Sequence, residues 1–458
     1  MAGHNFLVIG GGGREHALAW KLAQSSLTNQ VYCCPGNGGI AKDGNHKLNN
    51  IGIDWRDFAA LESFIREHKI VATLIGPEAP LVGGLGDYLR SKKHYCFGPN
   101  AEGAQLEGSK SFCKSFFDRH RVPTAAYQEF TSYVAAEDYL KHTSFPTVIK
   151  FDGLAGGKGV TVAESLESAL SALADIYKNH KFGKPEEGSE HKVVIEEFLV
   201  GEEVSCMIAV QGTEFKMLQT SRDHKPRDDG NKGPNTGGMG AYTPAVLQSA
   251  EVAAAGPAAQ APSALLSQEL ISYIEDKIVV PTIEGLAADG IDYCGFLYAG
   301  LMINAGQAKI LEYNCRLGDP ETEPLMFALE SDFAEFMLNC RGGGDGGGYR
   351  DAAGFLKNAD MSWHPGCSLS VIMASGGYPD AYATGKVITG LDDAVVEDVK
   401  VFHCGTEIDG DNAITTGGRV LAVTARGKDL DAAYNLAYEN VGKISWDNCY
   451  YRKDIGKI

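Results

Sequence analysis

The sequence lacks any long uninterrupted apolar run. None of its segments reaches the roughly 18 consecutive apolar residues that a membrane helix requires. The eleven cysteines include no Cys-x-x-Cys pair, and their odd number favours a reducing cytosol over a disulfide framework. The first residues, MAGHNFLVIGGGG, pass directly into a strand-like segment, so we expect no signal or transit peptide. A cytoplasmic protein without a membrane partner is therefore expected.

Basic charge is also scarce. The chain of 458 residues has 41 Lys and Arg against 59 Asp and Glu, which gives a formal net charge of −18. This balance argues against general nucleic-acid binding, which needs a basic footprint. Local glycine loops and lysines can still bind small anionic substrates. The length predicts roughly three domains.

Two glycine-rich stretches lack the defining residues of common nucleotide-binding motifs. In KFDGLAGGKGV (150–160), Asp152 replaces the first glycine of a P-loop and Gly159 replaces its hydroxyl residue. In VIGGGGREHA, the third glycine of a dinucleotide-binding fingerprint would be Glu15 or, in the next register, His16. A P-loop enzyme and a dinucleotide-dependent oxidoreductase are both disfavoured.

The first hundred residues alternate strand-like and helix-like segments, which predicts a parallel sheet with ligand loops at its strand ends. Glycine-rich turns follow successive strands: GGGG at 10–13, CPGNGG at 34–39 and IGPEAP at 75–80. The first turn opens a helix, so its N–H groups can bind a phosphate or sugar phosphate. A merely structural turn is the alternative for each of them.

The segments after the 150–160 loop indicate that the loop could be part of a nucleotide site. Lys150 ends a predicted strand, where it can pair with nucleotide phosphates while the loop covers them. In VIEEFLVGEEVS, the edge from Glu196 to Leu199 can face an adenine and Glu203 can bind ribose hydroxyls. A solvated hairpin is the plainer interpretation of that segment.

Glu312 and Asn314 stand two apart on a predicted strand and therefore on the same face. Such oxygen ligands suit Mg²⁺ bridged to substrate phosphates. Arg316, directly after them, can anchor a carboxylate or an acyl phosphate. The segment 223–244 (DHKPRDDGNKGPNTGGMGAYTP) has no periodicity, and a loop of this length is usually functional.

Lys150, the glycine-rich loop after it, the acidic segment at 196–203 and the strand with Glu312 and Asn314 follow one another in this order. In this order of features the chain resembles the ATP-grasp superfamily. Within it, the chain is most similar to the glycinamide ribonucleotide synthetase (phosphoribosylamine–glycine ligase) family. The resemblance covers essentially the whole chain, through motifs such as GGREHALAWKLAQS, PGNGG, IGPEAPL, DGLAGGKGV, GPNTGGMGAYTP, GFLYAGLM, NCRLGDPETEP, GGRVLAVTA and YRKDIG. Each motif alone is weak, whereas the ordered set is specific.

The resemblance implies a fold of α/β and α+β class. It implies an N-terminal parallel-sheet substrate domain at 1–104 and an ATP-grasp unit at 105–335, with a small lid subdomain at about 126–194. A C-terminal α+β domain would occupy 336–458. Two low-complexity segments, 253–263 and 342–354, are expected to be linkers or loops, and the second is a plausible domain boundary.

The resemblance also implies the reaction. ATP would phosphorylate the carboxylate of glycine, and 5-phosphoribosylamine would attack the glycyl phosphate, giving glycinamide ribonucleotide, ADP and phosphate in de novo purine biosynthesis. Mg²⁺ or Mn²⁺ would assist. Because this domain heads a trifunctional polypeptide in animals, fusion to or association with other purine-synthesis enzymes is possible for this chain too.

Residue roles are carried over motif by motif. Nucleotide contacts are expected from Lys110, Lys150, Gly153, Gly156, Gly157, Lys158, Gly159, Glu196, Glu197, Phe198, Leu199, Glu203, Lys225 and Asn235. Substrate contacts are expected from Gly11, Gly12, Gly13, Arg14, Glu15, Gly36, Asn37, Pro77, Glu78, Asp223, Arg316, Asp319, Pro320 and Glu321. Glu312 and Asn314 would hold the metal, and Lys150, Arg316 and Asp319 would act in catalysis.

The chain departs from the family pattern in three places. Gly156 replaces the usual alanine of the lid, so alanine should be tolerated there; Pro226 replaces a basic residue; and Gly300 stands where many other ATP-grasp enzymes carry a carboxylate. The rival interpretations are another ATP-grasp ligase, such as a purine carboxylase subunit or a D-alanine–D-alanine type ligase, and a nucleotide-binding regulator without catalysis. The retained lysines and metal ligands disfavour the regulator.

Overall fold

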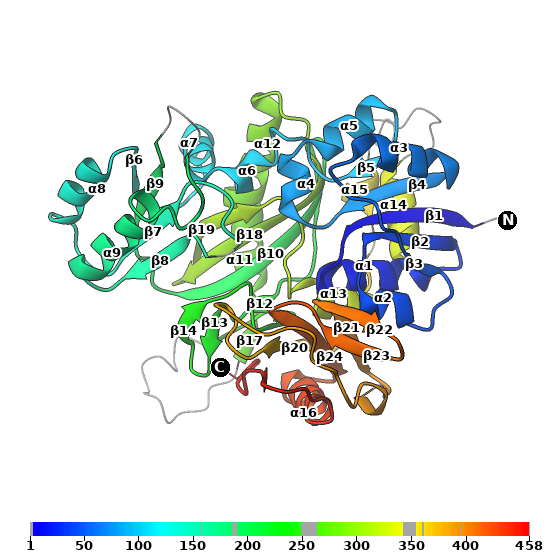
Figure 1. Ribbon diagram of the computed structural model, residues 1–458. Helices are drawn as coiled ribbons and strands as arrows, with labels where there is room; N and C mark the ends of the chain where they lie inside the picture. Colours follow the sequence, from blue (N-terminus) through cyan, green and yellow to red (C-terminus); the bar gives the residue numbers. More distant parts are fainter. Residues whose placement is uncertain are drawn as a thin grey trace.

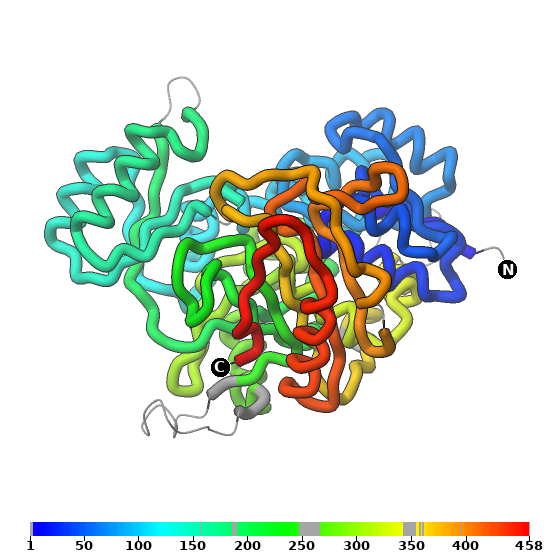
Figure 2. Tube along the Cα trace, turned by 60° about the horizontal axis from the view of Figure 1, so that its bottom comes forward, coloured from blue at the N-terminus to red at the C-terminus, as the bar shows by residue number. Residues whose placement is uncertain are grey.

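The computed structural model describes residues 3–156, 158–185, 190–248, 263–341, 354–359, 361–394 and 396–457. Gly157 of the expected lid, and most of the expected linkers 253–263 and 342–354, lie outside the described residues. The N-terminal unit (blue) lies on one side of a central sheet and the lid subdomain lies on the other (Figure 1). The C-terminal unit (orange to red) lies against both the central sheet and the N-terminal unit (Figure 2).

The N-terminal unit contains the parallel sheet that was predicted, and its five strands have the order β3-β2-β1-β4-β5. Its elements are β1 (His4–Gly10), α1 (Gly13–Ala23), β2 (Thr28–Pro35), α2 (Gly38–Lys42), β3 (Leu48–Asn50), α3 (Phe58–Glu67), β4 (Ile70–Ile75), α4 (Glu78–Val82), α5 (Leu85–Ser91) and β5 (Cys96–Phe97). Because β2 and β4 flank β1, the strand order reverses there, which opens a crevice at the carboxyl ends of the strands. The glycine turns lie at this crevice.

The lid subdomain is an antiparallel sheet in the order β6-β9-β7-β8, covered by two helices (Figure 1). Its elements are β6 (Tyr127–Phe130), α8 (Tyr133–Leu140), β7 (Thr147–Phe151), β8 (Val160–Ala163), α9 (Leu166–Tyr177) and β9 (Val193–Glu197). Ile149, Leu173 and Val193 are buried in a core that belongs to the subdomain alone. The lid is therefore a separately packed body.

The central sheet is antiparallel, in the order β11-β10-β18-β19. Its strands are β10 (Glu202–Gln211), β11 (Glu214–Met217), β18 (Cys294–Asn304) and β19 (Gln307–Asn314). The surrounding elements are α6 (Gln105–Gly108), α7 (Lys110–His120), the pair β16 (Val246–Gln248) and β17 (Ser263–Leu265), α11 (Gln268–Ile274), the π-helical turn η1 (Glu275–Val279), α12 (Val280–Ala288), α13 (Thr322–Ala328) and α14 (Phe333–Arg341). Among the described residues, no helix is both long and apolar enough to cross a membrane.

The C-terminal unit is built on a sheet that borrows strands from the middle of the chain. Its order is β12-β15-β20-β24-β21, with β25 paired to β20. Its elements are β12 (Arg222–Asp223), β15 (Gly240–Thr243), α15 (Phe355–Asn358), β20 (Cys367–Ser375), the 3-10 turn η3 (Asp392–Ala394), β21 (Val399–His403), the pair β22 (Thr406–Asp409) and β23 (Asn412–Thr415), β24 (Arg419–Gly427), α16 (Leu430–Val441) and β25 (Cys449–Tyr450). The borrowed strands β12 and β15 lie within the range predicted for the ATP-grasp unit.

The long segment 223–244 is more ordered than its lack of periodicity suggested. Besides β12 and β15 it forms a hairpin, β13 (Pro226–Asp228) with β14 (Lys232–Asn235). Gly230 and Asn231 both have positive φ (71° and 57°), which residues of these two types adopt most readily in a tight hairpin turn. The segment thus links the central sheet to the C-terminal sheet.

Candidate active site

One cavity of about 420 Å³ lies where the lid, the central sheet, the N-terminal unit and the C-terminal unit meet. Twenty of the residues predicted from the sequence line it: Arg14, Glu78, Lys110, Lys150, Gly153, Gly156, Gly159, Glu196, Glu197, Phe198, Leu199, Glu203, Asp223, Lys225, Asn235, Glu312, Asn314, Arg316, Asp319 and Glu321. The structure therefore brings together residues that are spread over three hundred positions of the chain.

Lys150 and Glu196 form the wall beneath the lid. Lys150 lies one residue before the end of β7, with its ammonium 2.9 Å from Glu196 Oε2, and it donates to the carbonyl of Leu311 at 2.9 Å. Lys114 approaches Glu196 Oε1 at 3.1 Å from the other side. Burial lowers the pKa of Lys114. The Glu196 carboxylate is held between two ammonium groups, and its carbonyl accepts from the Thr147 hydroxyl at 2.8 Å. The hinge residues Phe198 and Leu199, which also line the cavity, are therefore better placed than Glu196 to meet an adenine.

Glu312 and Asn314 face the cavity from β19, as the two-residue spacing predicted. Burial alone would raise the pKa of Glu312, but Lys110, Lys225 and Lys150 outweigh it and lower the pKa to about 2. The nearest of these ammonium groups, that of Lys110, lies 3.7 Å from Glu312 Oε2. The carboxylate is thus ionised at neutral pH.

Gly300 lies opposite Glu312 in the register of β18 and β19. It contributes no side chain, so no second carboxylate joins Glu312 from that position. Asn314 Oδ1 accepts from Arg316 Nη2 at 3.3 Å. Among the described residues, no group of three or more His, Cys, Asp or Glu side chains has metal-binding geometry.

A second part of the cavity is acidic. Glu203 forms an ion pair with Lys225, whose ammonium is also 3.7 Å from Asp223 Oδ2. Burial, together with the charge of Glu321, raises the pKa of Asp223 well above its ordinary value. Asp223 Oδ1 is buried and has no hydrogen-bond partner among the described residues. A cation placed beside this carboxyl group would favour its ionised form.

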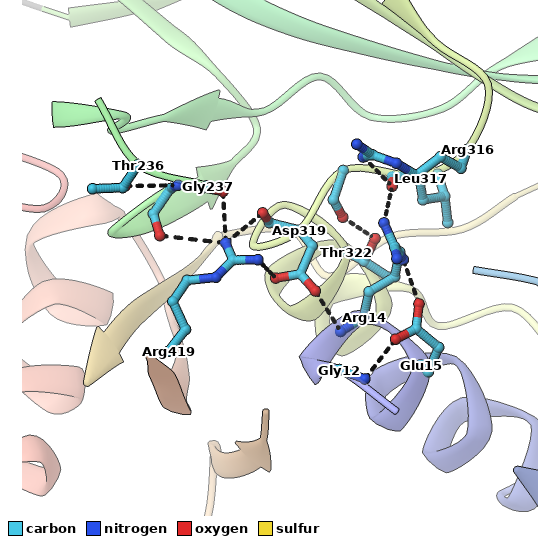
Figure 3. A network of polar contacts seen from close by, with 12 residues as sticks. Gly12, Arg14, Glu15, Thr236, Gly237, Arg316, Leu317, Asp319, Thr322 and Arg419 are labelled. Atoms are coloured by element: carbon cyan, nitrogen blue, oxygen red, sulfur yellow. Dashed lines mark hydrogen bonds and ion pairs between the residues drawn. The ribbon is translucent and has the colours of Figure 1, made fainter. Parts of the chain in front are cut away.

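The end of the cavity nearest the N-terminal unit holds two guanidinium groups. Arg316 Nε lies 3.3 Å from Glu78 Oε2, and its Nη2 lies 2.9 Å from Glu107 Oε1. Arg14 and Arg316 both donate to the carbonyl of Leu317 at 3.2 Å (Figure 3). The backbone at Leu317 thus fixes both arginines at one place.

The other predicted residues do not line the cavity: Gly11, Gly12, Gly13, Glu15, Gly36, Asn37, Pro77, Lys158 and Pro320. At the start of α1, the N–H of Gly12 donates to Glu15 Oε2 at 2.6 Å, and that of Arg14 donates to Asp319 Oδ2 at 3.4 Å (Figure 3). The protein's own carboxylates therefore occupy the helix N-terminus that we expected to bind a phosphate. Lys158 points elsewhere, with its ammonium 2.7 Å from the carbonyl of Pro379.

The sequence analysis missed several residues of the cavity, including Glu107, Thr236, Gly237, Tyr298 and Arg419. A two-residue period in GFLYAGLM would have found Tyr298, because this residue and Met302 lie on the same face of β18 as Gly300. No local signal marks Arg419, which comes from the C-terminal unit a hundred positions after Asp319.

A separately packed lid over a central antiparallel sheet, with lysines and a strand carboxylate facing the cavity between them, defines an ATP-grasp ligase. Three family models match the chain: phosphoribosylglycinamide synthetase N domain at residues 4–107, ATP-grasp (A) domain at 108–322 and C domain at 368–458. The chain belongs to the phosphoribosylglycinamide synthetase family. The resemblance seen in the sequence is thereby confirmed. The prediction that the chain is an enzyme of a family that uses ATP is confirmed as well.

Relatives of known name are similar over nearly the full chain. Phosphoribosylamine–glycine ligase of Allochromatium vinosum is 46% identical over 451 residues, which are 98% of this chain and 97% of the relative. The ligase of the same name from Escherichia coli K12 is 45% identical over 452 residues, which are 98% and 97% of the two chains.

Solved structures agree with these relatives. The crystal structure of phosphoribosylamine–glycine ligase from Thermotoga maritima matches with a TM-score of 0.76 and 32% identity, over 98% of this chain and all of that one. A biotin carboxylase from Campylobacter jejuni has a TM-score of 0.67 at 13% identity, over 99% of this chain and 94% of that one. At that identity the second match shows the shared fold alone.

Proposed function

We propose that this chain uses ATP to ligate glycine to 5-phosphoribosylamine, giving glycinamide ribonucleotide, ADP and phosphate in purine biosynthesis. The observation that carries the proposal is a single cavity in which basic, acidic and arginine-lined parts adjoin, in a chain of this family. Each part has the chemistry that one of the three substrates requires.

ATP would lie between the lid and the central sheet. Its phosphates would meet Lys110, Lys150 and the backbone N–H groups of the 153–159 loop, while its adenine would meet the Glu196–Leu199 edge. The proposal is supported by the position of both lysines, of Gly153, Gly156 and Gly159 and of the 196–199 edge on the cavity wall, and by the ion pairs that hold the lysines in place. Charge-assisted contacts of this kind are the strong ones in phosphate binding.

Glu312 and Asn314 would hold a divalent metal ion. An ionised carboxylate beside an amide oxygen is a donor set that fits Mg²⁺ or Mn²⁺, with phosphate oxygens and water as the other ligands. When bound, such an ion neutralises charge on the phosphates and orients them for transfer. Burial opposes ionisation of Glu312, but Lys110 and the other lysines outweigh it and lower its pKa. The carboxylate is therefore ionised and able to bind a metal ion at neutral pH.

Glycine would bind beside the phosphates with its ammonium toward Asp223 and Glu321. The buried Asp223 carboxyl, which has no hydrogen-bond partner on one oxygen, supports this placement. The amine substrate would enter from the N-terminal side. There the guanidinium charges of Arg14 and Arg316 suit its phosphate, and both residues line the cavity, whereas Gly11–Gly13 at the start of α1 do not.

The reaction then requires that the substrates be positioned for attack and that the negative charge on the transferring phosphoryl group be neutralised. A carboxylate oxygen of glycine attacks the γ-phosphorus of ATP, and the bond to ADP breaks. The amine nitrogen attacks the carbonyl carbon of the glycyl phosphate and gives up one proton to solvent, the C–O bond breaks, and phosphate leaves. Lys110 and Lys150 would neutralise the transferring group, and the lid would exclude the water that hydrolyses an acyl phosphate.

A cytoplasmic location is part of the proposal and is supported by the cysteines, all eleven of which are free. Association with other enzymes of purine synthesis stays a prediction.

The proposal is tested by measuring ADP release while each substrate is omitted in turn. We expect ADP release to require glycine and to be fastest with freshly prepared phosphoribosylamine. ADP release that is indifferent to glycine would contradict the proposal. Bicarbonate or D-alanine in place of glycine tests the rival ATP-grasp ligases.

A further inference from the structure

Arg419, from β24 of the C-terminal unit, lines the cavity. Arg419, the first residue of β24, donates from Nη1 to the carbonyls of Gly237 at 2.6 Å and Asp319 at 2.7 Å (Figure 3). Its Nη2 lies 2.9 Å from Asp319 Oδ1. The two carbonyls and the carboxylate belong to two loops of the neighbouring unit, so the planar guanidinium joins the loops to each other.

The Gly237 peptide is held by the C-terminal unit on both sides. Its carbonyl accepts from Arg419, and its N–H donates to the hydroxyl of Tyr378 at 3.1 Å. A Cβ at position 237 would lie 3.1 Å from Arg419 Cζ, so glycine is the residue that lets the guanidinium approach this closely. With Asn235 and Thr236, Gly237 lines the cavity.

Asp319 connects this contact to the third unit. Its Oδ1 faces Arg419, and its Oδ2 accepts from the backbone N–H of Arg14 at the start of α1 (Figure 3). Arg14 and Asp319 both line the cavity at its amine-substrate end. One carboxylate therefore lies between the N-terminal and C-terminal units, and one arginine balances its charge among the buried carboxyl groups of Glu321 and Glu323.

We infer that Arg419 is a positioning residue for the ligation step: it fixes the Gly237 peptide and the Asp319 carboxylate where glycine and the amine substrate meet, so that the C-terminal unit completes the site. The inference rests on the proposed function. Arg419 would act through Gly237 and Asp319 rather than by contact with ATP, because within the described part of the chain its side-chain hydrogen bonds go to residues 237, 238 and 319.

Lysine cannot replace this contact. An ammonium keeps the charge, but it lacks the rigid planar fork that satisfies acceptors on two loops at once. A displacement of the reacting groups by about 1 Å costs about 100-fold in rate. Arg419→Lys should therefore lower kcat/KM for glycine about 100-fold while the dissociation constant of ATP changes less than about twofold.

The experiment compares Arg419→Lys and Arg419→Ala with Arg426→Ala. Arg426 is a matched control because it stands on the same strand, pairs with Asp398 at 2.7 Å and lies outside the cavity lining. For each protein, calorimetry gives the ATP dissociation constant, steady-state kinetics give kcat and both KM values, and the thermal midpoint reports the fold. Millimolar guanidinium ion, added to Arg419→Ala, should restore part of the rate.

The inference is supported if both Arg419 variants have a lower kcat/KM for glycine and an unchanged affinity for ATP, and if guanidinium ion restores part of the rate of the alanine variant. It is overturned if Arg419→Lys stays within about threefold of Arg426→Ala, or if ATP affinity falls as far as the rate does, which would indicate a general loss of structure. If Arg419→Ala does not fold, Arg419→Lys alone decides. The wild-type rate tests the proposed function, and the ratio of variant to wild type tests Arg419, so the two failures are distinguishable.

Discussion

Gly156, in the lid loop, has a backbone conformation that alanine adopts only at a cost in free energy, and this cost can be measured. Its φ is +56°, in the left-handed region, and a Cβ built there meets no atom within 4 Å. The cost of Gly156→Ala is therefore that of the backbone alone, about 1 kcal/mol. If this loop conformation is the one that covers ATP, the variant should bind ATP about fivefold more weakly. The family resemblance alone, which puts alanine here, predicts no loss.

Two other glycines make the test sharper. Gly153 also has positive φ (148°), and a Cβ there would lie 2.8 Å from the Phe151 ring, so Gly153→Ala should lose more affinity than Gly156→Ala. Gly183 has positive φ (97°) with open space around it and does not line the cavity, so Gly183→Ala carries a similar backbone cost without touching the site.

The assay is calorimetric ATP binding, with hydrogen exchange of the 153–159 loop measured with and without a nonhydrolysable ATP analogue. We expect ATP affinity to fall in the order wild type and Gly183→Ala, Gly156→Ala, Gly153→Ala, and protection of the loop to rise when nucleotide binds. Equal affinity in all four proteins would refute the reasoning that this loop conformation contacts ATP.

Three further outcomes follow from the same geometry. Lys150→Ala should weaken ATP binding by about 1.5–3 kcal/mol, the value of a hydrogen bond to a charged group, whereas Lys114→Ala should leave ATP binding unchanged by calorimetry, because Lys114 pairs with Glu196 without lining the cavity. Glu312→Gln should lower kcat about 100-fold at saturating Mg²⁺, against no change in the exposed control Glu407→Gln; full activity would exclude the metal role. Since burial and Glu321 raise the pKa of Asp223, its carboxylate forms only as pH rises, so KM for glycine should fall with rising pH in wild type and be flat in Asp223→Asn.

The low pKa of Glu312 also has a consequence for stability. Burial opposes it, but Lys110 and the other lysines hold the folded-state pKa at about 2, below the ordinary value of 4.5. The ion-paired carboxylate thus contributes stability that is fully present above about pH 4.5 and is lost as pH falls toward 2. At the pH of the kinetic assays this carboxylate is ionised, so it does not contribute to the pH dependence of glycine binding.

Local patterns were enough to predict the parts of the site that depend on strand period and loop composition. The two-residue spacing placed Glu312 and Asn314 on one face, and the glycine loop after Lys150 was placed correctly between two strands. Both features depend only on residues that are close together in the sequence, so the local sequence is enough to predict them.

The parts that could not be predicted depend on register and on contacts between units. Glu196 lies between Lys114 and Lys150 because of how β7, β9 and α7 pack, which no single segment specifies. The start of α1 is filled by Glu15 from its own helix and by Asp319, 305 positions away from Arg14. Arg419 reaches the cavity because β15 leaves the ATP-grasp segment and pairs with the C-terminal sheet.

The central claim is that glycine is activated as an acyl phosphate in this cavity. The most direct measurement uses glycine with ¹⁸O in both carboxylate oxygens, together with ATP and phosphoribosylamine, and analyses the released phosphate by mass spectrometry. In the proposed sequence a glycine oxygen becomes the bridge to phosphorus, and the later C–O cleavage leaves it on phosphate. The account therefore predicts one ¹⁸O atom in each phosphate released. Phosphate that carries no ¹⁸O while glycinamide ribonucleotide forms would contradict it.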